Sequence, residues 1–341
     1  MKLNAFREEI SSFRKLLEDE ILRGYITRTL TSVLGAIRPV AAHGEPSPEF
    51  LAEEIVRGAR YGDKKLYEKA THITLQWSGY TSDLIKMARA GRAQTVYSQI
   101  APYVHGTVLD IGCGDGQIGK KLADAGHDVV LADVYKNQNI DETGLEFILF
   151  EQRERIPDAR QYDTTLLLTV MHHSDNPIET LRDAKERTKQ GGRIVIIESV
   201  YGIGSHIQEP SYGEPADSIS KEFKALTTEQ QRHANIFFDH FSNRVVQYSD
   251  EPSKKINVPY NFRTPSQWKD IFESMGLHQT HFKYLGMDQP TVPEYHTLHV
   301  LKKKRIFIPM TNKRENLNFS NTTLKERKPL DNRFKAQFWT N

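Results

Sequence analysis

The sequence has very little cysteine, no long apolar run and almost no net charge. The single cysteine, Cys113, excludes an internal disulfide and favours a reducing compartment such as the cytoplasm. No apolar run approaches the roughly 18 residues that a membrane-spanning helix needs, and no secretory signal is evident. A formal net charge of +2 argues against a surface-wide attraction to nucleic acid. We therefore expect a cytoplasmic protein with no membrane and no nucleic-acid partner.

Residues 1–100 show the apolar spacing of helices, and no strand pattern is convincing there. The first apolar stripe consists of Phe6, Ile10, Phe13, Leu17 and Ile21. Ser47-Pro48-Glu49 predicts the start of a later helix, because a capping hydroxyl precedes a proline at the first helical position. We interpret residues 1–100 as a helical lid or cap and as the candidate contact of a homodimer; packing alone is the alternative.

From residue 101 to residue 200, short apolar runs alternate with helical patterns. This alternation predicts a parallel sheet with helices on both faces. The apolar runs cover residues 108–111, 129–132, 147–150, 165–170 and 193–197. Ligands of such sheets bind beyond the carboxyl ends of the strands, so the functional residues should follow these runs.

The first run ends in a stretch rich in glycine, Asp-Ile-Gly-Cys-Gly-Asp-Gly-Gln-Ile-Gly at residues 110–119. In one interpretation, Gly114, Gly116 and Gly119 form the dinucleotide fingerprint G-x-G-x-x-G. Asp133 then stands at the end of the next run, where an acid that binds ribose is expected. This interpretation predicts an oxidoreductase that uses NAD(P).

In the second interpretation, Asp110, Gly112, Gly114 and Gly116 form D-x-G-x-G-x-G, which resembles motif I of the class I S-adenosylmethionine (SAM) methyltransferases. We favour it, because an acid inside the strand would repel a pyrophosphate. The resemblance implies that Asp110 lies near the amino-acid end of SAM and that Asp133 binds its ribose. The implied SAM site comprises Asp110, Gly112, Cys113, Gly114, Gly116, Gln117, Asp133, Val134, Val170 and Met171. No metal ion is expected.

A second motif extends the resemblance. Residues 162–177, Tyr-Asp-Thr-Thr-Leu-Leu-Leu-Thr-Val-Met-His-His-Ser-Asp-Asn-Pro, are similar to the motif that follows the fourth strand in small-molecule methyltransferases. Alternating runs at residues 277–285 and 295–301 resemble the antiparallel pair that closes the methyltransferase sheet. The implied fold is a Rossmann-like, seven-stranded α/β sheet with strand order 3-2-1-4-5-7-6. One position departs from the family pattern: Glu151 and Gln152 follow the third run, and the adenine contact cannot be placed.

These patterns divide the chain into three parts. Residues 1–100 form the helical N-terminal region, and residues 101–301 form the SAM-binding core, with a helical insertion at residues 201–265 that we expect to cover the substrate. Residues 302–341 form a basic polar tail, which we interpret as solvated or as draped over a partner.

Candidate catalytic residues stand at the ends of the fourth and fifth runs. His172 and His173 follow the fourth run, and a histidine suits a general base because its pKa lies near neutrality. We favour His173 as the base; packing of one histidine is the alternative. Glu198 ends the fifth run, where it would orient a histidine, bind an amine or cap the next helix.

The insertion holds the candidate substrate contacts. A single helix is predicted from Phe223 to Arg244, with polar residues interleaved among its aromatic residues. The candidate contacts are Tyr201, Asp239, His240, Asn243, Arg244 and Arg263. An ion pair of Asp239 with Arg244 is the structural alternative. Asp239, His240 and His233 match no strong metal-ligand spacing.

The resemblance implies methyl transfer from SAM to a hydroxyl or carboxyl oxygen of a small, natural-product-like or peptide acceptor. Within the methyltransferases, N-methylation of a small amine is the alternative. Outside them, the alternatives are the NAD(P)-dependent oxidoreductase and a SAM-fold scaffold without catalysis.

Overall fold

The computed structural model describes residues 13–38, 46–151, 154–251, 255–289 and 291–303. Phe6, Ile10, Gln152 and all but the first two residues of the basic tail lie outside these ranges. Within them, no helix is long and apolar enough to cross a membrane.

The described residues form one seven-stranded sheet with the order β3-β2-β1-β4-β5-β7-β6. This order confirms the fold predicted from the motifs. Strands β1 to β5 are parallel, whereas β7 pairs antiparallel with both β5 and β6. The strands are β1 Thr107–Ile111, β2 Asp128–Asp133, β3 Glu146–Leu149, β4 Tyr162–Leu168, β5 Thr188–Ser199, β6 Leu277–Gly286 and β7 His296–Lys303.

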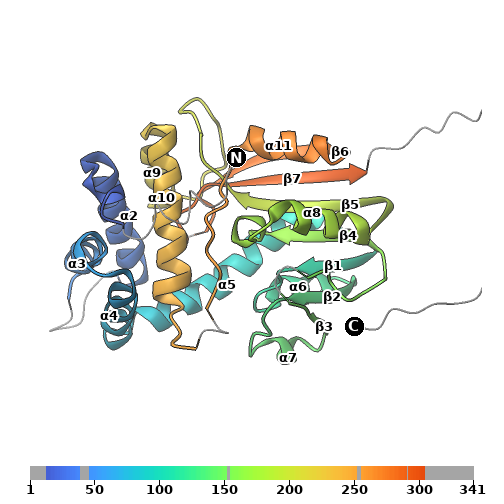
Figure 1. The fold of residues 1–341 in the computed structure, drawn as a ribbon, viewed down its shortest axis with the longest axis horizontal. Coiled ribbons are helices and arrows are strands. Elements are labelled where there is room, and N and C mark those ends of the chain that lie inside the picture. Colours follow the sequence, from blue (N-terminus) through green and yellow to red (C-terminus); the bar gives the residue numbers. More distant parts are fainter. Residues whose placement is uncertain (1–12, 39–45, 152–153, 252–254, 290, 304–341) are drawn as a thin grey trace, which may run out of the picture. The chain divides into compact units, whose positions relative to one another are not determined.

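Helices cover both faces of the sheet (Figure 1). The helices that flank it are α5 Tyr80–Ile100, α6 Gln117–Asp124, α7 Ile140–Thr143, α8 Pro177–Arg187 and α11 Pro265–Ser274, with the short 3-10 helices η2 Ala101–Tyr103 and η3 Met171–His173. Alternate residues of β1 point to opposite faces, so Val108 packs in the apolar cluster of α5 and α6, and Leu109 in the cluster of α8 and α11. Both faces of the strand are therefore buried, which explains why β1 is apolar from Val108 to Ile111 apart from Asp110.

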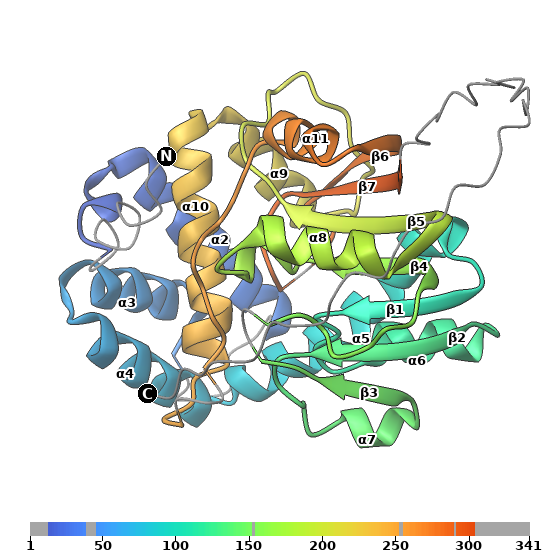
Figure 2. The same ribbon diagram turned by 45° about the vertical axis from the view of Figure 1, so that its right-hand side comes forward.

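A layer of helices lies beyond one end of the sheet (Figure 2). Its members are η1 Leu16–Glu18, α2 Glu20–Ile37, α3 Pro48–Tyr61, α4 Lys64–Trp77, α9 Ala216–Ala225, α10 Thr228–His240 and the π-helix η4 Phe241–Val246. We call this layer the helical cap. It combines the N-terminal region with the insertion, because α10 packs on α2 and η4 packs on α4. The cap faces the carboxyl ends of the parallel strands: Asp239 of α10 approaches His173, which follows β4.

Two predicted helices are interrupted. The first stripe does not continue through Ile21, because Asp19 caps the N-terminus of α2 and leaves Ile21 66% exposed. The helix predicted from Phe223 breaks before α10, where Thr227 forms a capping box with Gln230. In both places a cap starts a new helix, although the apolar spacing continues. The predicted start of α3 is confirmed, since Ser47 caps Phe50.

Candidate functional site

The bend after β1, residues 112–116, brings backbone close to the ends of two neighbouring strands. Gly112, Gly114 and Gly116 all have positive φ, at 71°, 58° and 73°, which side chains disfavour. A Cβ on Gly112 would lie 2.5 Å from a methyl of Val170, in the loop after β4. Only glycine fits at residue 112 without moving that side chain. A Cβ on Gly114 would meet nothing within 4 Å. The bend, which we call the glycine bend, is therefore tight on one side and open at its tip.

Two carboxylates flank the glycine bend. Asp133, at the end of β2, accepts a hydrogen bond from the Gly114 N–H at 2.9 Å. Asp110 in β1 is 2% exposed, and its Oδ2 has no hydrogen-bond partner among the described residues. Burial raises the pKa of Asp110 to about 7, and the charges of Asp133 and Asp115 add to this rise. A buried carboxylate without a partner is suited to a cationic ligand group.

A groove of about 560 Å³ lies beside Asp133, at the ends of β2 and β3. Its lining consists of Val134, Leu149, Phe150, Glu151, Glu154 and Pro157. Val134 and Leu149 are 48% and 58% exposed, which leaves apolar surface available to a flat ring. The structure thus supplies a candidate adenine site that the sequence pattern did not. Apart from Val134, none of these side chains was among the predicted contacts.

The remaining predicted contacts around the bend are mostly buried. Cys113 and Met171 are 7% and 0% exposed, and burial raises the pKa of the Cys113 thiol. Gln117 starts α6, and its N–H donates to Asp115 Oδ1 at 3.2 Å. Cys113 contributes its backbone to the glycine bend. The side chain of Val170 packs against Gly112 and closes one side of the bend.

Glu198, at the end of β5, holds the loop after β4. Its Oε1 accepts hydrogen bonds from the N–H groups of Val170 and Met171 at 3.0 and 2.7 Å, and its Oε2 lies 2.7 Å from His172 Nδ1. Burial raises the pKa of Glu198 to about 7 and lowers that of His172 to about 4. Phe262 stacks on the His172 ring at 5.1 Å. Glu198 thus lies where it can orient His172, and it also accepts hydrogen bonds from the backbone that starts η3. The helix it was predicted to cap is the one after β5, and Glu198 makes none of these contacts with that helix.

His173 faces the helical cap. Its Nδ1 lies 2.9 Å from the carbonyl oxygen of Asn257, and its Nε2 lies 3.5 Å from Asp239 Oδ1. Asp239 is 1% exposed; its Oδ1 accepts from Asn243 Nδ2 at 2.7 Å, and its Oδ2 has no hydrogen-bond partner in the described part of the chain. The structure therefore brings Asp239 and Asn243 of the insertion to the predicted catalytic histidines.

Two other predicted substrate contacts lie in a buried charge cluster. His240 Nε2 and Arg244 Nη2 approach the two carboxylate oxygens of Glu68 at 3.2 and 3.3 Å, and Tyr260 lies 2.8 Å from His240 Nδ1. Burial lowers the pKa of His240 to about 4. The partner of Arg244 is Glu68 of α4, and the alternative ion pair with Asp239 was wrong. This cluster joins the insertion to the N-terminal helices.

Tyr201 and Arg263 lie together beyond the end of β5. Tyr201 donates a hydrogen bond to Gln267 at 3.5 Å, and the Arg263 guanidinium lies 4.8 Å from the centre of the Trp268 ring. Burial lowers the pKa of Arg263. Arg263 also donates to the carbonyl of Asn261 at 2.9 Å. Arg263 directly follows Phe262, whose ring stacks on His172.

Sequence patterns missed two charged residues near these groups. Arg92 of α5 donates to Thr169 Oγ1 at 2.8 Å, and its positive charge opposes the rise in the pKa of Asp110. Glu294, just before β7, is 3% exposed and accepts a hydrogen bond from Ser199. Burial and the charge of Asp239 raise the pKa of Glu294. No sequence signal marks either residue, because each meets the strand ends only in the folded chain.

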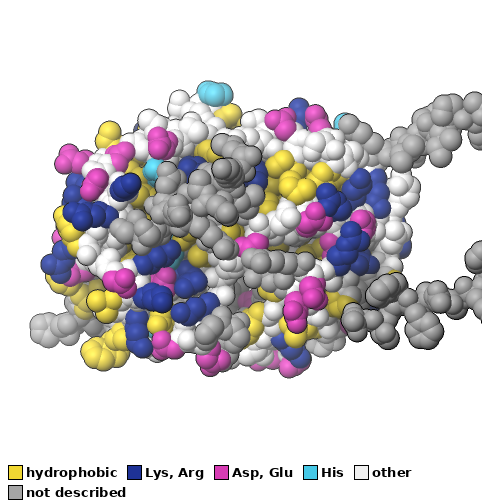
Figure 3. Space-filling view, in the orientation of Figure 1, with side chains coloured by type: hydrophobic (Ala, Val, Ile, Leu, Met, Phe, Trp, Pro, Cys, Tyr) yellow, Lys and Arg dark blue, Asp and Glu magenta, His cyan; other side chains and the backbone are white. Residues whose placement is uncertain are grey.

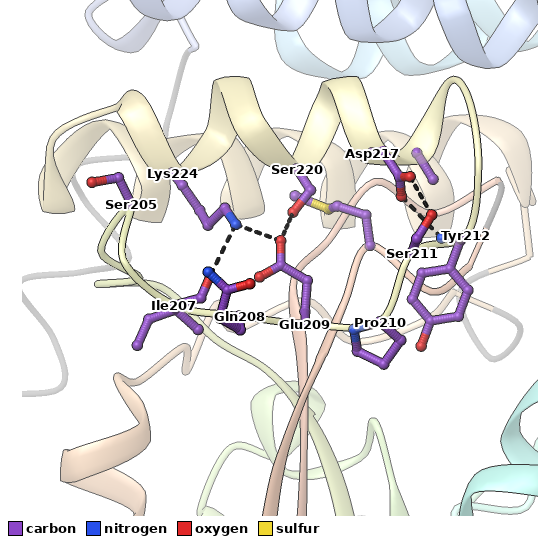
Figure 4. Close-up of a pocket in the computed structure, with 12 residues that line it drawn as sticks. Ser205, Ile207, Gln208, Glu209, Pro210, Ser211, Tyr212, Asp217, Ser220 and Lys224 are labelled. Carbon is purple, nitrogen blue, oxygen red and sulfur yellow. Dashed lines mark hydrogen bonds and ion pairs between the residues drawn. The ribbon is translucent and has the colours of Figure 1, made fainter.

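A separate cavity of about 220 Å³ lies under α9 in the insertion (Figure 4). Glu209 points toward Lys224 and Ser220 at 2.6 and 2.7 Å, and Asp217 binds Ser211 and the Tyr212 backbone (Figure 4). These polar groups satisfy one another. The contacts fasten the segment from residue 205 to residue 212 onto α9.

Comparison with known proteins relates the chain to one family. The family model described as a methyltransferase domain matches residues 87–281. The chain is 23% identical over 232 residues to a tRNA U34 carboxymethyltransferase from Shewanella pealeana, covering 54% of this chain and 67% of that one. A ubiquinone biosynthesis O-methyltransferase from Ruegeria sp. (strain TM1040) is 29% identical over 118 residues, 32% of this chain and 48% of the relative.

Among solved structures, the 1,6-didemethyltoxoflavin-N1-methyltransferase of Burkholderia thailandensis, with bound 1,6-didemethyltoxoflavin and S-adenosylhomocysteine, matches with a TM-score of 0.41 and 14% identity. That match covers 70% of this chain and 90% of the other.

Proposed function

The chain belongs to the class I SAM-dependent methyltransferases, since the family model spans more than half of it, and we propose that it methylates a hydroxyl oxygen of a small acceptor. The donor is SAM. The single observation that carries the choice of a hydroxyl is the approach of His173 Nε2 to the Asp239 carboxylate at 3.5 Å.

The residues present fit SAM. The unpartnered Oδ2 of buried Asp110 suits the ammonium of its methionine end, and the Asp133 carboxylate suits two adjacent ribose hydroxyls. The open tip at Gly114 lets the backbone approach the ligand closely, and the groove at Val134 and Leu149 suits adenine. When bound, SAM supplies a methyl group that its sulfonium has already activated.

The task of the chain's own residues is to hold an acceptor oxygen in line with that methyl and to remove its proton. His173 Nδ1 faces a carbonyl oxygen, which only accepts, so Nδ1 carries the hydrogen and Nε2 presents a lone pair. The Nε2 lone pair and the Asp239 carboxylate face each other without a hydrogen between them. An acceptor hydroxyl has a single hydrogen, which it would donate to His173 Nε2. His173 then accepts the proton, and the buried charge of Asp239 stabilises the resulting imidazolium.

Charge favours a hydroxyl over a carboxylate acceptor. Asp239 is buried beside His173, and its carboxylate would repel a second negative group. Arg263 is the cation that a carboxylate acceptor would require, which makes carboxyl methylation the second candidate. The Ruegeria relative's name, an O-methyltransferase, also supports an oxygen acceptor.

The name of the Shewanella relative raises tRNA as an acceptor. We favour a small molecule, because the formal net charge is only +2 and the basic side chains on the face in Figure 3 are interspersed with acidic ones. We also propose that the helical cap covers the acceptor, that its N-terminal helices mediate homodimer formation, and that the protein is cytoplasmic.

A test incubates purified protein with methyl-labelled SAM and panels of phenols, alcohols, carboxylic acids, amines and tRNA. We expect S-adenosylhomocysteine to form when a hydroxyl compound is present. The mass of that compound should rise because a methyl group replaces its hydroxyl hydrogen. The carbon chemical shift of the labelled methyl distinguishes O-methyl from N-methyl products. Turnover with amines or tRNA alone would overturn the hydroxyl assignment, and absence of turnover with every panel would favour a scaffold.

A further inference from the structure

Three side chains at the end of β4 present hydrogen-bond acceptors to one another. His172, His173 and Asp239 each offer one ligand atom, and these atoms all lie within 4.8 Å of one another. Asp239 comes from α10 of the helical cap, whereas the histidines follow β4. This grouping differs from the sequence-based candidate, in which Asp239 was considered with His240 and His233.

The neighbours of the histidines fix which ring nitrogen is bare. The carbonyl oxygen of Asn257 takes the Nδ1 hydrogen of His173 at 2.9 Å. Glu198 Oε2 takes the Nδ1 hydrogen of His172 at 2.7 Å, while its Oε1 accepts from two backbone N–H groups. Both Nε2 atoms are therefore lone-pair donors. A carboxylate or carbonyl on Nδ1 is the arrangement that orients metal-binding histidines in proteins.

Asp239 adds an anionic ligand. The residue is 1% exposed, and its Oδ2 has no hydrogen-bond partner among the described residues, whereas Asn243 orients its Oδ1. Leaving a buried carboxylate oxygen without a partner is unfavourable, so this position favours a cation or a hydrogen-bond donor.

We propose that His172, His173 and Asp239 bind a divalent first-row transition-metal ion, with zinc as the best match. Two neutral imidazoles and one carboxylate form the ligand set of catalytic zinc sites that keep a coordination position open. The 3.5 Å between His173 Nε2 and Asp239 Oδ1 is close to the ~3.4 Å that separates two ligands of a tetrahedral zinc ion. Side-chain rotation brings the third ligand into place.

The role of the ion, though not its binding, rests on the proposed function. The acceptor hydroxyl binds the open position, and the ion lowers its pKa so that the proton leaves to solvent. The oxygen lone pair then attacks the methyl carbon, and the carbon–sulfur bond breaks with its electron pair going to sulfur. In the metal-loaded enzyme, His173 Nε2 would bind the ion, and His173 would not accept the proton of the acceptor. The family as a whole requires no metal, so this site would be a property of this chain.

The test measures binding of Co²⁺, and of Zn²⁺ in competition, to the full-length, tag-free protein after chelation and dialysis. We expect one ion per chain, a visible Co²⁺ absorption band typical of tetrahedral coordination, and at least 100-fold weaker binding in His173→Gln and Asp239→Asn. Glu198→Gln, which removes the carboxylate that faces His172 Nδ1, should weaken binding by about 10- to 100-fold. His278→Gln, an exposed histidine of β6, is the matched control and should bind as the wild type does.

A SAM titration and a thermal melt check that each variant is folded. Absence of stoichiometric Co²⁺ binding to the wild type, or equal binding by the ligand variants, overturns the metal site and leaves methyl transfer untouched. Metal binding without methylation of any acceptor overturns the proposed function and leaves the site intact. The wild-type measurement decides the question even where a variant fails to fold.

Discussion

Replacing Asp110 by asparagine should stabilise the protein near neutral pH and weaken its binding of SAM. In the folded chain, burial raises the pKa of Asp110 from 3.8 to about 7. A carboxyl whose pKa is raised by folding contributes its full stability below the unfolded pKa. That contribution is lost as the pH rises through the folded pKa. The wild type should therefore lose stability between pH 3.8 and about 7 on account of this residue, whereas Asp110→Asn should not.

The size of the effect follows from the shift. Each pKa unit corresponds to about 1.4 kcal/mol, so ionised Asp110 costs the folded state about 4 kcal/mol. The amide hydrogens of asparagine would themselves lack partners there, at about 1–3 kcal/mol. Above neutrality the variant should then be about 1–3 kcal/mol more stable than the wild type. Loss of one charge-assisted hydrogen bond should weaken SAM binding by about 10- to 100-fold.

Urea unfolding and SAM calorimetry, at a mildly acidic and a mildly alkaline pH, measure both effects. The wild type should bind SAM more tightly at the higher pH, because only ionised Asp110 attracts the ammonium, and Asp110→Asn should lose this dependence. Asp128→Asn, exposed at the start of β2, is the control. Two results together would refute the predicted role of Asp110. Asp110→Asn would be less stable than the wild type at the higher pH, and the SAM affinity of the wild type would not depend on pH.

Three further substitutions test other parts of the structure. Gly112→Ala should cost about 2–4 kcal/mol in urea unfolding, because it adds a clash at 2.5 Å to a positive φ, whereas Gly191→Ala, with nothing within 4 Å, should cost only about 1–2 kcal/mol. Arg244→Ala should lower the melting temperature, because it removes one of the cationic partners of buried Glu68. The KM for the acceptor should stay within about twofold of the wild type. A large rise in KM with unchanged stability would instead support the predicted substrate role of Arg244. Arg92→Leu should weaken SAM binding, because without the Arg92 charge the pKa of Asp110 rises further and less of this carboxyl is ionised. Unchanged affinity in calorimetry would count against this influence of Arg92.

Much of the fold follows from the sequence because the sheet is buried on both faces. Apart from Asp110, β1 is apolar from Val108 to its end, and glycine follows it at once, so it was predictable from the sequence. The motifs in residues 101–301 then predicted the order of the strands. The helical cap was less predictable. At Asp19 and Thr227 a single capping side chain ends one helix and starts another, and apolar periodicity is insensitive to such a break.

The site divides in the same way. Asp110, Asp133 and the histidines lie where strands end, and sequence position alone locates strand ends. Glu68 of α4 meets residues of α10 and η4, and Arg92 of α5 meets Thr169 after β4. No local sequence pattern records these long-range contacts. The ion pairs of His240 and Arg244 with Glu68 were not predicted for that reason: the polarity of these two residues was visible in the sequence, but the acid they surround was not.

The central claim is that SAM binds at the glycine bend between Asp110 and Asp133. Calorimetric titration of SAM into the wild type and into Asp133→Ala tests it most directly. We predict one SAM per wild-type chain and binding at least about 100-fold weaker in the variant, because two ribose hydroxyls lose their carboxylate. Equal affinity of the two proteins for SAM, or heat of binding with NAD and none with SAM, would contradict the claim.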